Sequence, residues 1–165
     1  MRLQKITPFL WFDNQAEEAA RFYTSVFPNS AIRAISRYSD AGPGPKGSVM
    51  TVSFDLDGQQ FVALNGGPHF HFTEAVSFVV NCEDQREVDA YWEKLLEGGQ
   101  ESQCGWLKDK FGLSWQIVPI RMFEMLEDSE SEGTQRAFKA MLKMKKLDLP
   151  TLEKAYFGTV AATGP

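Results

Sequence analysis

The chain has 165 residues, 43% of them hydrophobic and 24% charged, which is typical of a globular protein with one domain or two small modules. Its formal net charge of −5 argues against a nucleic-acid partner, and no apolar run reaches the roughly 18 residues of a membrane span. The N-terminal residues turn polar too early for a signal peptide, and Cys82 and Cys104 form no CxxC pair or disulfide framework, so we expect a reduced, cytoplasmic protein.

The first half of the chain predicts a strand, a helix and then three strands. Apolar residues between Ala16 and Phe27 keep helical spacing, and Pro28-Asn29 ends that helix. Asp57-Gly58 is a hairpin signal between two apolar runs. The predicted elements are a strand near 8–12, a helix over 16–27 and strands over 31–38, 48–56 and 59–65.

The second half begins in the same way and ends differently. A strand is predicted from Ser77, followed by a helix that ends at Gly98-Gly99 and by a strand over 113–119. After Pro119 the pattern becomes helical. Three helices are predicted within RMFEMLED (121–128), TQRAFKAMLKMKKL (134–147) and DLPTLEKAYFG (148–158).

The two halves resemble each other in sequence. Residues 8–27 align without a gap on residues 77–96, at an offset of 69, with Phe9 against Phe78. Asp55-x-x-Gly58 then aligns with Asp109-x-x-Gly112 at an offset of 54. This repetition predicts an α+β fold made of two paired βαβββ modules. We place the modules at 3–68 and 69–119 and a helical extension at 120–160.

The extension has more apolar surface than a peripheral helix needs. Phe138, Met141, Leu142 and Met144 form apolar faces that must cover something. The partner is either the extension's own sheet or a second subunit. Because closed two-fold dimers are the commonest soluble assembly, we expect a homodimer.

Three segments resemble the PhnB-like branch of the vicinal oxygen chelate superfamily, which includes glyoxalases, bleomycin-resistance proteins and extradiol dioxygenases. They are WFDNQAEEAARFY, GSVMTVSFDLDGQQFVALNGGP and QCGWLKDKFGLSWQIVP. Members of this branch are often labelled 3-demethylubiquinone-9 3-methyltransferase by similarity. The resemblance implies that the modules close a cup with the helices outside, and that a small organic ligand, aromatic or quinone-like, binds in it.

Metal enzymes of the superfamily place four ligands, mostly His and Glu, on strand positions that face the cup. Here the Glu of the last strand falls on Gln116, and its counterpart in the first module is Val62. The His positions fall around Ala75–Ser77 and Ile6–Pro8, where Glu74 is a near miss. A neutral carboxamide is a weak ligand alone. We therefore expect no inherited metal site and no cofactor.

The candidate ligand-binding residues combine aromatic walls with a few polar groups, as small-molecule sites do. Strand alternation means that some of the aromatic candidates must face the helices instead. The walls are Phe9, Trp11, Trp106 and Trp115, and the polar groups are Asn65, Ser77 and Gln116.

Enzymatic alternatives stay open, and no catalytic residue is identified. A metal-dependent lyase or dioxygenase could use another site, such as His69 and His71, although these read more simply as residues of a solvated linker. Cys104 lies near two lysines and is either a reactive thiol or a small buried hydrophobe. The methyltransferase label also lacks support in the chain, which has no Gly-rich strand-to-helix turn for S-adenosylmethionine.

Overall fold

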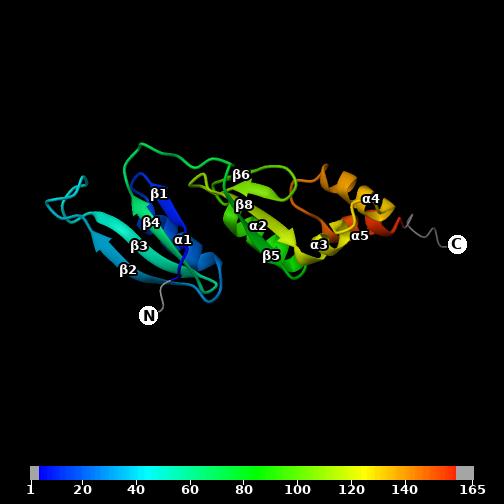
Figure 1. Ribbon diagram of the computed structural model, residues 1–165, viewed down its shortest axis with the longest axis horizontal. Helices are drawn as coiled ribbons and strands as arrows, with labels where there is room; N and C mark the ends of the chain where they lie inside the picture. The colour runs from blue at the N-terminus through cyan, green and yellow to red at the C-terminus, as the bar shows by residue number, and fades with distance from the viewer. Residues whose placement is uncertain (1–3, 159–165) are drawn as a thin grey trace. The chain divides into compact units, whose positions relative to one another are not determined.

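The computed structural model describes residues 4–158 (Figure 1). The chain divides between Phe72 and Thr73 into two compact units. The first unit contains β1 (Phe9–Phe12), α1 (Ala16–Val26), β2 (Ala31–Arg37), β3 (Val49–Leu56) and β4 (Gln59–Asn65). The second contains β5 (Ser77–Cys82), α2 (Gln85–Leu96), β6 (Gln100–Glu101), β7 (Trp106–Lys108), β8 (Ser114–Pro119), α3 (Ile120–Leu126), α4 (Glu132–Met141) and α5 (Leu149–Phe157).

Each unit contains one four-stranded mixed sheet with the same connectivity. The strand orders are β1-β4-β3-β2 in the first unit and β5-β8-β7-β6 in the second. In each sheet the first strand runs parallel to the last, and the remaining pairs are antiparallel. The predicted α+β fold of two βαβββ modules with C-terminal helices is confirmed.

Helix α1 covers one face of the first sheet. Its buried residues recur at helical spacing, and three of them are alanines, which let the helix lie close to the strands. The ring of Tyr23 lies 6.3 Å from that of Phe54, which in turn lies 5.6 Å from that of Phe61. These three aromatic residues are all buried and form the centre of the first core.

Helix α2 covers the corresponding face of the second sheet. Asp84 caps its start by accepting a hydrogen bond of 3.0 Å from the backbone N–H of Glu87. The buried residues of the helix are Val88, Trp92 and Leu95, and those on the covered side of the sheet are Val80, Cys82, Leu107, Trp115 and Ile117.

The strand pairing corrects the gapless alignment of the two halves. Phe9 pairs with Val62, and the residue that pairs with Gln116 is Val79, not Phe78. Val62 and Gln116 correspond in the two modules, at an offset of 54. Their strand partners, Phe9 and Val79, therefore correspond as well, which gives the first strands an offset of 70. The helices keep the offset of 69, since the turn between strand and helix is one residue shorter in the second module. A shift of one residue in a strand exchanges its two faces, so this gap decides which residues share a side.

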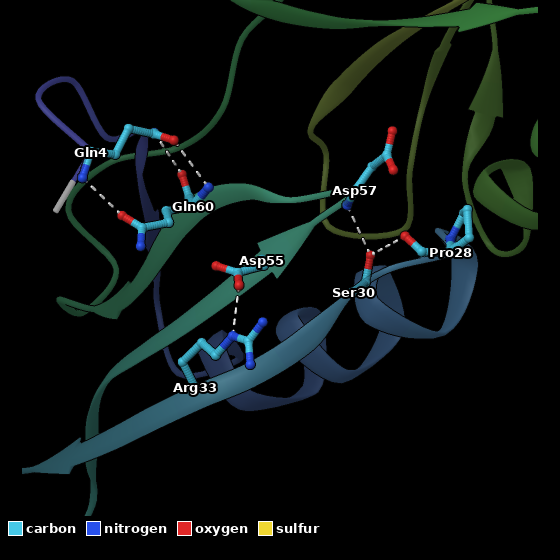
Figure 2. Close-up of polar contacts among 7 residues, drawn as sticks. All are labelled: Gln4, Pro28, Ser30, Arg33, Asp55, Asp57 and Gln60. Atoms are coloured by element: carbon cyan, nitrogen blue, oxygen red, sulfur yellow. Dashed lines mark hydrogen bonds and ion pairs between the residues drawn. The ribbon is translucent and has the colours of Figure 1, made fainter. Parts of the chain in front are cut away.

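The predicted hairpin at Asp57-Gly58 is confirmed. Both residues have positive φ angles, of 47° and 80°, as a type I′ turn requires. The loop after α1 supports the turn, because Ser30 Oγ accepts a hydrogen bond of 3.1 Å from the Asp57 N–H (Figure 2). The same hydroxyl donates to the Pro28 carbonyl at 3.0 Å.

Strand β2 contains a bulge that the sequence did not predict. The register with β3 shifts between Ile32 and Ala34, so Arg33 is the extra residue. Bulges re-aim side chains, and Arg33 Nε donates to Asp55 Oδ2 at 2.6 Å (Figure 2). The other oxygen of Asp55, Oδ1, is buried and has no hydrogen-bond partner among residues 4–158.

Helices α3, α4 and α5 pack together on the second sheet. Their core is a cluster made by Val118, Met122, Met125, Leu147 and Leu152. The helix predicted over 134–147 ends early, at Met141. The reason is tertiary, because the carbonyls of Met144 and Lys145 accept hydrogen bonds from the backbone N–H groups of Cys104 and Gly105.

The side chain of Gln85 fastens this segment to the start of α2. Its Nε2 donates to the Leu147 carbonyl at 3.0 Å, and its Oε1 accepts from the Leu149 N–H at 2.6 Å. Among residues 4–158 no helix is long and apolar enough to cross a membrane.

Candidate ligand-binding faces

Each sheet has one face that its own helix covers and one that it does not, which we call the open face. In the first module the open face presents Phe9, Trp11 and Val62. In the second it presents Val79, Trp106 and Gln116, with Ser77 on the neighbouring rung. The predicted ligand-binding residues, seven with Trp115, are therefore divided between the two units, and each group is described by itself.

Gln116 is on the open face of the second sheet, half-buried between Val79 and Trp106 on the neighbouring strands. Its Nε2 donates to Ser77 Oγ at 2.9 Å. Its Oε1 has no hydrogen-bond donor in the part of the chain that the structure describes. The two polar candidates of this module thus form one pair, whose carboxamide oxygen is available to a ligand.

Trp115 lies on the opposite face and cannot be a wall of the same site. It is 3% exposed, and its ring lies 5.7 Å from that of Phe78. Its Nε1 donates to Asp109 Oδ2 at 2.9 Å. Asp109 Oδ1 also accepts from the backbone N–H groups of Phe111 and Leu113, so the carboxylate organises the turn that precedes β8.

Phe9 and Trp11 lie on the open face of the first sheet. Phe9 is 58% exposed, a large apolar surface for a strand residue. Trp11 is held more firmly, because its Nε1 donates to the Gly67 carbonyl at 2.9 Å and its ring lies edge-on to Phe70 at 4.9 Å. A Cβ on Gly66 would lie 2.2 Å from the indole, so a glycine is required there.

Asn65 has a structural task that the sequence analysis did not foresee. Its Oδ1 accepts a hydrogen bond of 2.8 Å from the Ala16 N–H, which is the function of an N-cap for α1. Its Nδ2 donates to the Val49 carbonyl at 3.2 Å. The local cap residue, Gln15, forms no side-chain cap bond. The absence of a capping side chain at Gln15 is the sequence signal that could have pointed to a distant cap. Contact between Asn65 and a ligand stays a prediction.

The donor set does not fit the superfamily's metal centre. By strand pairing, the positions that correspond to Gln116 and Ser77 in the first module are Val62 and Thr7. None of the four offers an imidazole or a carboxylate. Within residues 4–158 no three His, Cys, Asp or Glu side chains are grouped so that they could hold a metal ion.

The sequence analysis missed three residues of the second open face. Val79 was missed because the gapless alignment placed Phe78 at its position. Lys108 and Ser114 flank the rung of Trp106 and Gln116, and they are partners of each other. Counting two residues back from Gln116 along the strand would have found Ser114.

Comparison with known proteins supports the fold and names the family. The chain matches the family described as 3-demethylubiquinone-9 3-methyltransferase over residues 4–118. It is similar to the PhnB protein from Bacillus cereus, with 42% identity and a TM-score of 0.65 over 70% of this chain and 99% of that one. No curated protein matches.

Two further solved structures share the fold at lower identity. Protein PA1353 from Pseudomonas aeruginosa has 20% identity and a TM-score of 0.59, over 71% of this chain and 98% of that one. The fosfomycin resistance protein FosX from Mesorhizobium loti has 14% identity and a TM-score of 0.54, over 78% of this chain and 100% of that one.

The family match ends at residue 118, and α3 begins at Ile120. The helices after β8 are thus an addition to the part that the family shares. The family match over residues 4–118, the strand order of the two modules and the 42% identity to PhnB show that this chain belongs to the 3-demethylubiquinone-9 3-methyltransferase, or PhnB-like, family.

Proposed function

We propose that the protein binds a small organic ligand, aromatic or quinone-like, on the open faces of its modules. The observation that carries this proposal is the rung of Val79, Gln116 and Trp106, where an exposed apolar residue, a carboxamide and an indole lie side by side. Ligand sites combine apolar walls with a few polar groups in this way.

The pair formed by Gln116 and Ser77 suits such a role. A carboxamide can donate and accept hydrogen bonds at once, and only one of its N–H groups is used, by the Ser77 hydroxyl. Half-burial lowers the local dielectric, so a hydrogen bond to a ligand carbonyl or hydroxyl there is stronger than one in water.

The proposed mode of action is binding without an inherited metal. The four corresponding positions hold Thr7, Val62, Ser77 and Gln116, and hard or borderline divalent ions prefer carboxylate and imidazole ligands. The name of the family describes a methyl transfer, but 42% identity to PhnB supports membership of the family and not a particular reaction. Binding is therefore the function that the side chains support best.

Native mass spectrometry of the purified, untagged protein tests this proposal. We expect a retained organic molecule or, after addition of aromatic and quinone compounds, a specific adduct that Gln116→Leu weakens. Gln135→Leu is the matched control, because Gln135 is exposed on α4. A stoichiometric metal would favour the metal enzyme, and a retained sulfonium cofactor would favour the methyltransferase.

We also propose that the chain is a cytoplasmic homodimer. Both cysteines are free thiols, as a reducing compartment requires. On the C-terminal helices, Phe123, Phe138, Leu142 and Phe157 are each about half exposed or more. Apolar surface of this kind is the usual material of a subunit interface.

A further inference from the structure

A pocket of about 150 Å³ lies beside Trp106 on the second module. The lining side chains that determine its chemistry are those of Glu74, Trp106, Lys108 and Ser114. Lys108 and Ser114 are partners on one rung, next to the rung of Trp106 and Gln116. A ligand held on the proposed open face of the second module is therefore within reach of the pocket.

Ser114 supplies an unsatisfied polar group inside the pocket. The residue is 1% exposed, and its Oγ forms no hydrogen bond with any described residue. A buried hydroxyl without a hydrogen-bond partner destabilises the folded protein. Alternation turns Ser114 to the same side of the sheet as Gln116, and the residue lines the pocket.

Lys108 already holds a carboxylate at this pocket. Its Nζ forms an ion pair with Glu74, which lies in the turn before β5. The hydrogen bond from Lys108 lowers the pKa of Glu74. The Glu74 side chain is 62% exposed and that of Lys108 is 35% exposed. Ion pairs of this exposure are weak, so a second carboxylate can compete with Glu74 for Lys108.

The first module carries different side chains at the corresponding place. Its corresponding rung pairs Asp55 with Gln60, and Gln4 corresponds to Glu74 at the offset of 70. Gln60 Oε1 accepts from the Gln4 N–H at 3.1 Å, and the Gln4 side chain bonds the backbone of Gln60 (Figure 2). The second module has the shorter Ser114 in place of Gln60, and the pocket lies beside it.

We infer that the pocket is a subsite for a monocarboxylate attached to a ring-sized apolar group. The ligand carboxylate replaces that of Glu74 on Lys108 and accepts a hydrogen bond from the Ser114 hydroxyl, while the ring lies against Trp106. A dry cavity of roughly 150 Å³ is large enough for a benzene ring. This inference rests on the proposed function and specifies the acid group of its ligand.

The charges favour a monocarboxylate over a phosphate. Among residues 4–158, Lys108 is the only Lys or Arg that lines the pocket. Glu101 lines it as well and is paired at 3.3 Å with Lys145. A dianion would leave one charge without a partner among these residues. A monoanion that displaces Glu74 keeps the local charge balanced, because the released carboxylate moves into water.

Benzoate is the probe for this inference, with isoelectronic but neutral benzamide beside it. Trp fluorescence and calorimetric titrations of the full chain are expected to show benzoate binding and much weaker benzamide binding. Lys108→Met should weaken benzoate binding about 10- to 100-fold, the value of a charged hydrogen bond. Glu74→Gln should strengthen it up to about fivefold by removing the competitor.

Ser114→Gln introduces the residue of the first module and should abolish binding by filling the pocket. Ser114→Ala should weaken it about 2- to 10-fold. Lys94→Met removes an exposed lysine of α2 and should leave binding unchanged. Circular dichroism checks that each variant folds. If Ser114→Gln does not fold, the variants of the half-exposed Lys108 and Glu74 still test whether the pocket binds the carboxylate.

Equal affinity for benzoate and benzamide, or undiminished binding by Lys108→Met, overturns the subsite. An absence of benzoate binding by the wild type overturns it too. The proposed function survives these outcomes if aromatic or quinone compounds still bind in a manner that Gln116→Leu weakens. If those compounds also fail to bind, both proposals are wrong.

Discussion

The two modules share one topology but carry different side chains on corresponding rungs of their open faces, and one rung differs in charge. In the first, Asp55 faces Gln60 and is held by Arg33. In the second, Lys108 faces Ser114 and is held by a carboxylate. The charges are reversed, and a pocket lies beside this rung in the second module. Repetition of a fold thus preserves the covered face, which makes the core, and leaves the open face free to acquire different chemistry.

The modules also differ in how they secure their helices. Helix α2 has a local cap, Asp84, three residues before the N–H group that it bonds. Helix α1 is capped from a distance by Asn65, which lies at the end of β4. The second module further has the C-terminal helices, which the first lacks. Each of these differences can be tested by a substitution or a truncation.

The largest effect is expected from truncation after Pro119, which removes the C-terminal helices that only the second module has. The deletion exposes Val118 and takes away the carbonyls that bond Cys104 and Gly105. We expect light scattering to find a dimer for the full chain and a monomer or aggregates for the shortened one. A full-length chain that is monomeric at tens of micromolar contradicts the dimer, and a shortened clean dimer contradicts only the role of the helices.

Asn65→Ala should be the most damaging of the single substitutions proposed for the helix caps. It removes the cap of α1 and leaves the Val49 carbonyl without its side-chain donor, at a cost of about 2–3 kcal/mol in the free energy of unfolding. Asp84→Ala, the matched change in the second module, should cost only about 1 kcal/mol. Thermal melting separates the two, with falls in Tm of about 4–12 °C and about 2–4 °C. Equal falls in Tm would show that the cap formed by Asn65 stabilises the protein no more than the local cap formed by Asp84.

Gln116→Leu should leave the fold nearly intact while changing the open face. Leucine has a similar volume, and the lost hydrogen bond to Ser77 is only partly buried, so we expect a fall in Tm of no more than about 3 °C. Val62→Gln is the reciprocal change, because it places the carboxamide at the corresponding position of the first module. A fall above about 8 °C for Gln116→Leu would make the residue structural instead of ligand-binding.

The smallest effect concerns the cysteines and leaves stability unchanged. Cys82 takes the position of Phe12 on the covered face, where burial, and then the nearby Glu87, raise the pKa of its thiol to about 12. At pH 8 only about one such thiol in ten thousand is ionised. A colorimetric thiol reagent should therefore modify the half-buried Cys104 first and Cys82 only on unfolding. The Cys104→Ser variant should lose the fast phase of the reaction with the reagent. If the two thiols of the wild type react at equal rates, Cys82 is accessible to the reagent.

The sequence alone determined the architecture of this protein, because secondary structure follows local patterns that survive without knowledge of contacts. Helical spacing, the Asp57-Gly58 turn and the repeated Asp-x-x-Gly segments predicted two βαβββ modules followed by helices. Strand alternation also indicated that some of the aromatic candidates face the helices. These features depend on neighbours within a few residues along the chain.

Only the tertiary structure decided which residues share a face across strands and what each one does there. A one-residue difference in the turn before the helix moved Val79, not Phe78, opposite Gln116, because strand faces alternate with every residue. Asn65 became a cap because β4 brings it to the start of α1, across 49 residues of chain. The pocket beside Ser114, whose counterpart in the first module is the longer Gln60, is a property of packing and not of pattern.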